Sequence, residues 1–423
     1  MNACRRWLVS LIILVISYTI HAIDNPHFYR ALRFWDEPRF ERPWLNSWQL
    51  NAGFATTRHS RNPHGSIAPL WDIIGPQNLQ FLGTNVPNLD PANPIDQLLI
   101  DVAALPVRTT FGNVSFNGEF ALFEIIGECY QNIINGFFFQ AYLPLLRSLT
   151  VSNINFTDLS PDDNEFPNKN TPAWQNLLSG FGTILNRYHI MIPNTMHRTG
   201  IGDLSFLAGW ASTYQETHVL DFVDVSAKIG VLFPTAATAS FHHPFELPLG
   251  YNGHFGLPLK FDCSLGAYGW ITIGFHQGAL FLFKRAQHIL LKTTAQQNGF
   301  ILLAHEKVTI DPGTIWEIGT YAKADHVVRG LSLYAGYSFT KHDNSTLEVE
   351  NSNFDIDIIN HDERFNGWDM HTFHVSAEYD FADSLVDLGP RIGIWFNIII
   401  GGRRIFNAHL FDSLFGLECL WQF

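Results

Sequence analysis

Apolar and polar residues alternate along most of the chain with a period of two. In residues 222–234, for example, Val223, Val225 and Ala227 take one set of positions, and Asp224 and Ser226 take the other. Successive side chains of a β-strand point to opposite faces, so each such segment has one apolar and one polar face. Twelve segments follow this pattern, which predicts an all-β protein. The predicted strands are 47–57, 113–127, 137–151, 203–214, 222–234, 257–266, 270–283, 316–323, 331–339, 372–381, 386–400 and 413–423.

The connections between these strands are alternately long and short. The short ones lie near Glu128, Glu216, Tyr268, His326 and Asp383, and the long ones lie between them. Barrels that cross the outer membrane have brief turns on the periplasmic side and extended loops on the outer side. We therefore predict a transmembrane, antiparallel, up-and-down β-barrel of about twelve strands. The even number returns both ends of the barrel to the periplasmic side.

Two long connections are expected to contain short helices. In the first, Asn93 is a suitable N-cap, Pro94 a suitable first helical residue, and Pro106 a stop. In the second, residues 172–188 carry apolar side chains at helical spacing. This second helix is expected either to lie on the barrel rim or to narrow the lumen, and both possibilities stay open.

The last strand carries an apolar face that ends in aromatic rings. Phe415, Leu417, Trp421 and Phe423 share this face. A terminal Phe that closes such an alternation resembles the C-terminal signature of Gram-negative outer-membrane β-barrels. The resemblance implies that these four residues form a signal for the barrel-assembly machinery and that the barrel is surrounded by outer-membrane lipid.

A second resemblance involves residues 200–203 and 230–235. The Gly200-Ile201-Gly202-Asp203 entry to a strand, together with the later run from Gly230 to Thr235, is similar to segments of outer-membrane channels for hydrophobic or aromatic compounds. A nucleotide-binding glycine motif is not indicated, because no helix is predicted to follow the glycines.

The N-terminus has the features of a secretory signal. Arg5 and Arg6 precede an apolar stretch, and Ala22 ends a plausible cleavage site, so we predict a signal peptide over residues 1–22. The alternative is an uncleaved anchor helix. Residues 23–46 are expected to be a periplasmic lead-in or a segment tucked into the barrel mouth. Residues 47–423 would form the barrel in the bacterial outer membrane.

Composition narrows the class of protein further. Hydrophobic residues make up 46% of the chain, but after the N-terminal segment no apolar run is long enough for a membrane-spanning helix. Loss of the signal peptide changes the formal charge from −13 to −15, so nucleic acid is not an expected partner. The remaining cysteines, Cys129, Cys263 and Cys419, lie in or beside apolar strands and are interpreted as small hydrophobic residues.

The polar faces of the strands carry the candidate function. No nucleophile elbow, metalloprotease motif or phosphate loop is present, so we predict neither an enzyme nor a cofactor or metal site. The predicted lumen-lining residues are Glu119, Asp224, Lys228, Lys260, Asp262, Glu317, Lys323, His374, Glu378, Asp380, Arg391 and Glu418. Acidic groups outnumber basic ones, and the connection 342–367 is also acidic. A porin-like channel for passive diffusion of small solutes, with a weak preference for cations, is therefore predicted.

Other functions stay open at this point. A barrel enzyme of the lipase or protease type is one, and Asp325-His326 is superficially similar to an omptin-like protease pair. The predicted topology, however, places that pair in a periplasmic turn. A structural or adhesive barrel is another. The lumen charges could also pair with one another across adjacent strands, and the acidic connection could bind divalent cations or simply be solvated.

The terminal strand gives the first testable prediction. Deletion of Trp421 to Phe423 should abolish barrel assembly in the membrane while export continues, because the open edge would leave backbone groups unpaired in lipid. Assembly is measured by the difference in gel migration between heated and unheated samples. A normal heat-modifiable barrel from the truncated protein would contradict the assignment.

Overall fold

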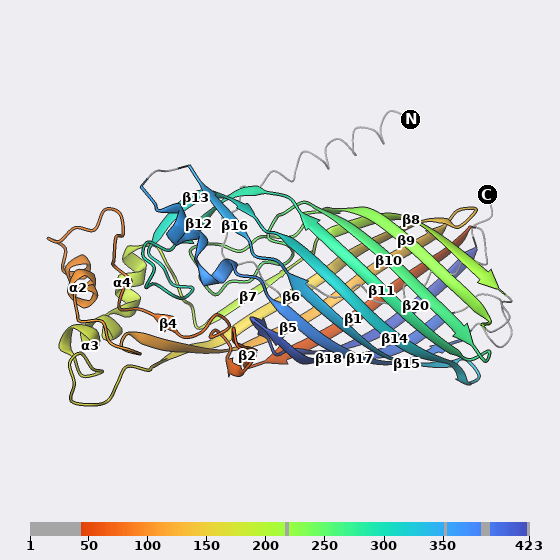
Figure 1. Ribbon diagram of the computed structural model, residues 1–423, viewed down its shortest axis with the longest axis horizontal. Helices are drawn as coiled ribbons and strands as arrows, with labels where there is room; N and C mark the ends of the chain where they lie inside the picture. The colour runs from red at the N-terminus through yellow and green to blue at the C-terminus, as the bar shows by residue number, and fades with distance from the viewer. Residues whose placement is uncertain (1–43, 216–219, 351–352, 382–389, 421–423) are drawn as a thin grey trace.

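Twelve long antiparallel strands close into one barrel (Figure 1). The computed structural model describes residues 44–215, 220–350, 353–381 and 390–420. β1 pairs with β5 on one side and with β20 on the other, so the sheet closes on itself. The barrel strands are β1 (Leu45–Thr57), β5 (Asn113–Asn132), β6 (Phe137–Asp158), β8 (Leu204–Gln215), β9 (Phe222–Phe233), β10 (Gly256–Ala267), β11 (Ile271–Leu282), β14 (Thr314–Val328), β15 (Leu331–His342), β17 (Asp369–Asp380), β18 (Pro390–Arg403) and β20 (His409–Leu420).

The predicted strands are confirmed, with some differences at their ends. β5 and β6 are longer than expected, and β14 continues through His326, so the turn lies at residues 329–330. The full length of β6 was not predicted, because irregular pairing interrupts its alternation of apolar and polar residues. The register shifts opposite Ile125 and Ile126, and Asn153 has a positive φ of 56°. An extra residue in one strand reverses the alternation beyond it. The predicted signal peptide, the first part of the lead-in and residues 386–389 and 421–423 lie outside the described residues.

The outer face of the barrel is apolar. Phe261, Ile273, Phe396 and Phe415 are among the side chains that remain about half exposed on this face. An apolar belt of this kind is suited to contact with hydrocarbon. A slip of one residue in β17 would turn Glu378 and the other inner residues of that strand outward, which fixes the pairing register. Among the residues that the structure describes, no helix is both long and apolar enough to cross a membrane.

The two ends of the barrel differ. Short turns join strands at one end, which we call the turn end, and the longer connections gather at the other, which we call the loop end (Figure 1). The connection from β18 to β20 is the exception to the predicted alternation, because only residues 404–408 separate the two strands. The remaining short strands are β2 (His59–Arg61), β3 (Ile67–Pro69), β4 (Gln77–Asn78), β7 (Thr195–Gly200), β12 (Arg285–Leu291), β13 (Ala304–Asp311), β16 (Thr346–Val349) and β19 (Ile405–Phe406).

Apolar side chains of the long connections pack together at the loop end. We call this cluster the cap. Trp71, Trp174, Phe245, Phe300 and Phe406 come from five different connections and are almost completely buried in it. Inward-facing residues of the neighbouring strands join the same cluster, namely Ala55, Phe116, Phe120, Leu122, Leu149 and Val151. The loops are therefore a packed layer over the end of the barrel, stabilised by the burial of large apolar side chains.

The helices lie in this layer. α2 (Pro94–Ala103) begins as predicted, with the side chain of Asn93 accepting a hydrogen bond from the backbone N–H of Ile95. The predicted helix 172–188 is two helices, α3 (Pro172–Ser179) and α4 (Phe181–Arg187), which meet at Gly180. Figure 1 shows both at the loop end, beyond the barrel wall, so this segment does not form a constriction inside the barrel. The connections also contain α5 (Ile356–Asn360) and a 3-10 turn, η2 (Glu363–Phe365).

An ion pair between Asp96 and Arg187 links α2 to the end of α4. The Arg187 guanidinium donates to both carboxylate oxygens of Asp96, from Nε at 2.7 Å and from Nη2 at 2.6 Å. The Tyr188 hydroxyl donates to the same carboxylate at 2.8 Å. The hydrogen bonds from Arg187 lower the pKa of the Asp96 carboxyl to about 2, and burial raises the pKa of Tyr188 to about 12.

This ion pair predicts how the cap responds to acid. The pKa of Asp96 is lower in the folded chain than its ordinary value of 3.8, so its stabilisation is complete above that value and is lost as the pH falls towards about 2. Cleavage of residues 94–187 by pepsin should therefore increase between pH 4 and pH 2 in the wild type. Asp96→Asn should be cleaved readily at both pH values. Equal acid sensitivity of the two proteins would contradict the role of the pair.

Candidate functional site

The inner face of the barrel is polar. Strand alternation places ten of the twelve predicted lumen residues on this face, opposite the exposed apolar belt. These are Asp224, Lys228, Lys260, Asp262, Glu317, Lys323, His374, Glu378, Asp380 and Arg391. Several are almost fully buried, with Glu317 only 2% exposed and Lys228 only 5% exposed. The lumen is therefore filled by its own side chains at these levels.

Glu119 was predicted to line the lumen, but it does not. It alternates with Gly118 and Phe120, and Phe120 packs into the cap on the inner side, so Glu119 points outward. There it forms an ion pair with Arg58 at 2.5 Å. The apolar residues of this part of β5 face inward because the cap, and not a polar lumen, lies behind them.

The residues of the predicted assembly signal are only partly described. Phe415 and Leu417 lie on the outer face and are 52% and 42% exposed. The backbone of Glu418 pairs with Ser47, which continues the closure of the barrel, but its side chain lies outside the described residues. Trp421 and Phe423 also lie outside them.

Basic residues of the lumen lie next to acidic ones. Lys228 is 3.7 Å from Asp262, and Arg391 donates to Glu378 at 3.1 Å. Each of these pairs joins adjacent strands. This arrangement matches the alternative in which the lumen charges pair across the wall. Pairing compensates for burial, which would otherwise make an isolated charge very costly.

One group of charges spans three strands. The ammonium group of Lys260 on β10 approaches Glu317 on β14 to 4.0 Å, although β11 lies between the two strands. Gly278 of β11 is the residue opposite both of them, and its missing side chain leaves the space open. His276 completes the group, since its Nε2 lies 3.1 Å from the Glu317 carboxylate. A Cβ atom at Gly278 would lie 3.6 Å from the Glu317 carboxylate, so only a small side chain fits between the two charged groups.

A buried, doubly hydrogen-bonded pair of the lumen was missed by the sequence reasoning. Arg147 on β6 donates to the Glu124 carboxylate through Nε at 3.1 Å and Nη2 at 2.9 Å, and both side chains are buried. Its Nη1 also donates to the backbone oxygen of Leu249 at 2.7 Å, which connects the wall to the cap. Arg147 follows the irregular pairing in β6, where the alternation changes phase. The sequence did contain an indication of this pair. Glu124 and Glu128 lie four positions apart on β5, and both face inward.

A hydrogen-bonded row crosses four other strands, β15, β17, β18 and β20. Ser338 Oγ lies 2.7 Å from His374 Nε2, and His374 Nδ1 lies 2.6 Å from Asn397 Oδ1. Asn397 in turn donates to Asp412 at 3.2 Å. The order of groups is that of a serine–histidine–amide triad. However, Ser338 is only 1% exposed and faces the lumen, so a substrate cannot reach its hydroxyl in this conformation.

The other candidate groups have structural partners. Asp325 forms an ion pair with Lys323 at 2.9 Å and accepts from the Ser332 hydroxyl. It was predicted to lie in a turn, but it lies within β14. In the acidic connection, Glu348 pairs with Lys284 and Glu363 pairs with Lys292. Among the described residues, no group of three or more His, Cys, Asp or Glu side chains is arranged to hold a metal ion.

A small cavity lies in the lumen next to the Arg147 pair. Its volume is about 70 Å³, and its lining includes Arg147, Asp203, Lys260 and Tyr251. A water molecule occupies roughly 30 Å³ in the liquid, so this space holds only a few of them. The side chains of the inner wall therefore leave little space at this cavity.

Comparison with known proteins gives similarity in fold only. No protein-family model and no curated protein matches the sequence. An outer-membrane channel from Pseudomonas putida F1 has 9% identity and a TM-score of 0.47, covering 93% of this chain and 99% of that one. The deltaS2S3 mutant of the TodX monoaromatic hydrocarbon channel has 8% identity and a TM-score of 0.38, covering 90% and 91%. The CymD monoaromatic hydrocarbon channel has 8% identity and a TM-score of 0.31, covering 91% and 90%.

These three structures are channels by name, the class of protein that the sequence resembles. Their identities and TM-scores are low. The function therefore has to be argued from the residues of this chain.

Removal of one member of the Arg147–Glu124 pair is expected to lower the stability of the barrel strongly. Arg147→Met should destabilise the barrel by roughly 3–5 kcal/mol, because Glu124 would remain buried without its partner. The double variant Glu124→Gln/Arg147→Met should recover most of the loss, since it removes both charges. Denaturant unfolding of protein refolded into lipid vesicles measures both values. Equal destabilisation in the single and double variants would show that charge compensation is not the cause.

Proposed function

We propose that the protein is a porin-like outer-membrane channel for the passive diffusion of small solutes. The observation that carries this proposal is the contrast between the two faces of the wall. The outer face is apolar, while the inner face carries ion pairs such as Lys228 with Asp262 and Arg391 with Glu378. A closed barrel with such a lumen offers polar solutes a route through lipid. Export by the N-terminal signal peptide and insertion by the barrel-assembly machinery are parts of the same proposal.

The charge of the inner face supports a weak preference for cations. The acidic residues among the described inward-facing strand positions include Glu124, Glu128, Asp224, Asp262, Glu317, Asp325, Glu378, Asp380 and Asp412. The basic ones are Arg147, Lys228, Lys260, Lys323 and Arg391. An excess of carboxylates along a narrow passage raises the local concentration of cations. The acidic connection at the loop end adds to this effect.

The cap is the element that limits passage. Its side chains are packed across the loop end, and the cavity beneath it has a volume of only about 70 Å³. Solutes therefore need a movement of the cap before they can enter the lumen. Trp71 is central to its packing, since the ring is 4.6 Å from Phe245, 5.6 Å from Phe300 and 5.4 Å from Phe406, measured between centroids.

A second candidate is a barrel enzyme of the lipase type. The row of Ser338, His374 and Asn397 is the specific observation that favours it. The burial of Ser338 inside the barrel weighs against it, because an acyl substrate arriving from lipid meets the outer face. The channel is therefore the function that the geometry supports best.

Single-channel recording tests the proposal. The refolded wild type should give a small conductance in a planar bilayer, and Trp71→Ala should increase it several-fold, because a large cavity in the cap weakens the packing of the loops. In a salt gradient the reversal potential should indicate a preference for cations. Thr183→Ala, a change at an exposed position of α4, serves as the control and should behave as the wild type.

Two outcomes would contradict parts of this proposal. If an intact, heat-modifiable barrel conducts neither as wild type nor as Trp71→Ala, the channel function is wrong. If the reversal potential shows a preference for anions, the channel remains but the predicted charge selectivity is wrong.

A further inference from the structure

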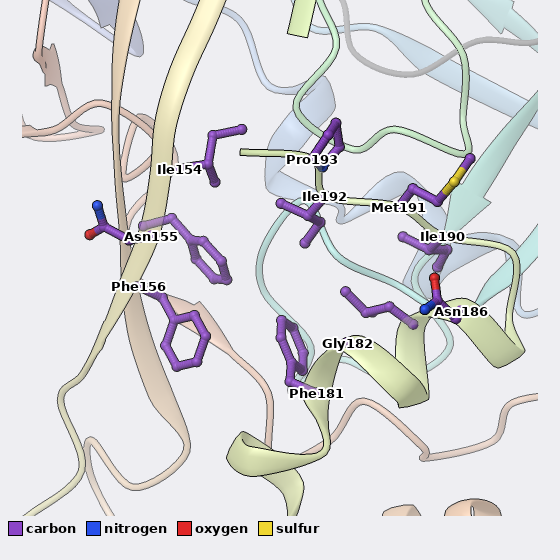
Figure 2. A pocket seen from close by; sticks show the side chains of 12 residues that line it. Ile154, Asn155, Phe156, Phe181, Gly182, Asn186, Ile190, Met191, Ile192 and Pro193 are labelled. Atoms are coloured by element: carbon purple, nitrogen blue, oxygen red, sulfur yellow. The ribbon is translucent and has the colours of Figure 1, made fainter. Parts of the chain in front are cut away.

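An apolar pocket opens at the loop end, between the wall and α4 (Figure 2). One side is formed by the end of β6, with Asn155 and Phe156, and by Phe116 of β5. The other side is formed by α4 and the segment that follows it, including Phe181, Gly182 and residues 190–193. The pocket has a volume of about 450 Å³. Binding sites for small molecules commonly have volumes of about 300–1,000 Å³, so this one is large enough to hold a ligand.

The lining of the pocket indicates which ligands would fit. All of its lining side chains are uncharged. The rings of Phe156 and Phe181 meet edge to face at 5.6 Å, and Phe116 lies 5.6 Å from Phe156. Aromatic rings favour such edge-to-face and offset contacts with further rings. The lining has two polar side chains, Asn155 and Asn186. The Asn155 amide accepts from Asn117, donates to the backbone oxygen of Asn153 and points away from the pocket (Figure 2), so only Asn186 offers a polar side chain to a ligand. An ion would lose its hydration here without compensation.

Gly182 of α4 lines the pocket and adds no side chain to it. A Cβ atom at this position would meet no heavy atom within 4 Å. Glycine is less favourable than alanine within a helix, so a larger residue at this position would favour α4. Neither steric crowding nor an unusual backbone angle requires glycine here, since Gly182 is not among the residues with positive φ. The sequence thus leaves apolar space open at a place where filling it would stabilise the fold.

We propose that this pocket binds neutral, ring-containing apolar molecules at the loop end of the barrel. The binding would not require the lumen to conduct, so this proposal goes beyond the channel function and can be tested separately from it. The pocket also has a physical connection to the cap. Its Phe116 ring lies 5.2 Å from Phe245, which in turn contacts Trp71 at the centre of the cap. A ligand that displaces Phe116 would therefore disturb the packing that closes the loop end.

Photolabelling with a neutral aryl diazirine tests the proposal on the purified full-length barrel in detergent. Mass spectrometry should find saturable labelling in residues 154–156 and 181–193, and excess naphthalene should reduce it. Gly182→Phe should lower this labelling at least tenfold, because its ring would occupy the pocket. Gly182→Leu, with a smaller side chain, should give an intermediate loss. Thr183→Phe adds the same ring at the next position, which is exposed and does not line the pocket, and should leave the labelling unchanged.

Heat-modifiable migration of each variant confirms that the barrel is intact. Labelling that is equal in the wild type and Gly182→Phe, or that is confined to the outer belt of the barrel, would overturn the proposal. Competition by naphthalene-2-sulfonate as strong as that by naphthalene would overturn the neutral character of the ligand. None of these results depends on conductance, so a barrel that fails to conduct but is labelled in the pocket would support this inference alone.

Discussion

The structure depends on the pairing of β1 with β20. In hydrocarbon, each unpaired backbone N–H or C=O costs several kcal/mol, so a sheet is stable there only when it has no free edge. The twelve strands meet this requirement through an uninterrupted register from Leu45–Leu420 to Thr56–His409. Closure of the sheet separates its two faces, so that each face has its own environment. The apolar outer face is suited to lipid, and side chains on the inner face are left to pack with one another and with the cap.

This separation explains the unusual burial of charge. A lumen enclosed by twelve strands is narrow, so ionisable side chains on opposite parts of the wall cannot all remain in water. They are arranged in pairs, such as Glu124 with Arg147 and Glu378 with Arg391. Breaking one pair would leave a buried charge, which is why such groups constrain each other strongly. At the loop end the inner face changes to apolar residues, because there it packs against the aromatic side chains of the cap.

The cap and the wall are coupled at a few defined points. Arg147 holds Leu249 by a hydrogen bond, while Phe116 and Phe120 of β5 take part directly in the apolar cluster. Asp96 and Arg187 hold two helices of the cap together. Movement of the cap would therefore require changes at contacts that link loops to strands. The ion pair between the helices could remain intact during such a movement.

The sequence by itself determined the all-β class, the twelve strands, the face on which most residues lie and the start of α2 at Asn93. These features depend on residues that are two to four positions apart, so local alternation and capping are sufficient to reveal them. The tertiary structure alone decided where the alternation changes phase in β6, and therefore that Arg147 faces inward. It also decided that Glu119 faces outward, that the helical segment breaks at Gly180, and that the loops close the barrel end. Most of these features depend on contacts between segments far apart in the chain, as between Arg147 and Leu249, and no local pattern records which distant residues will meet.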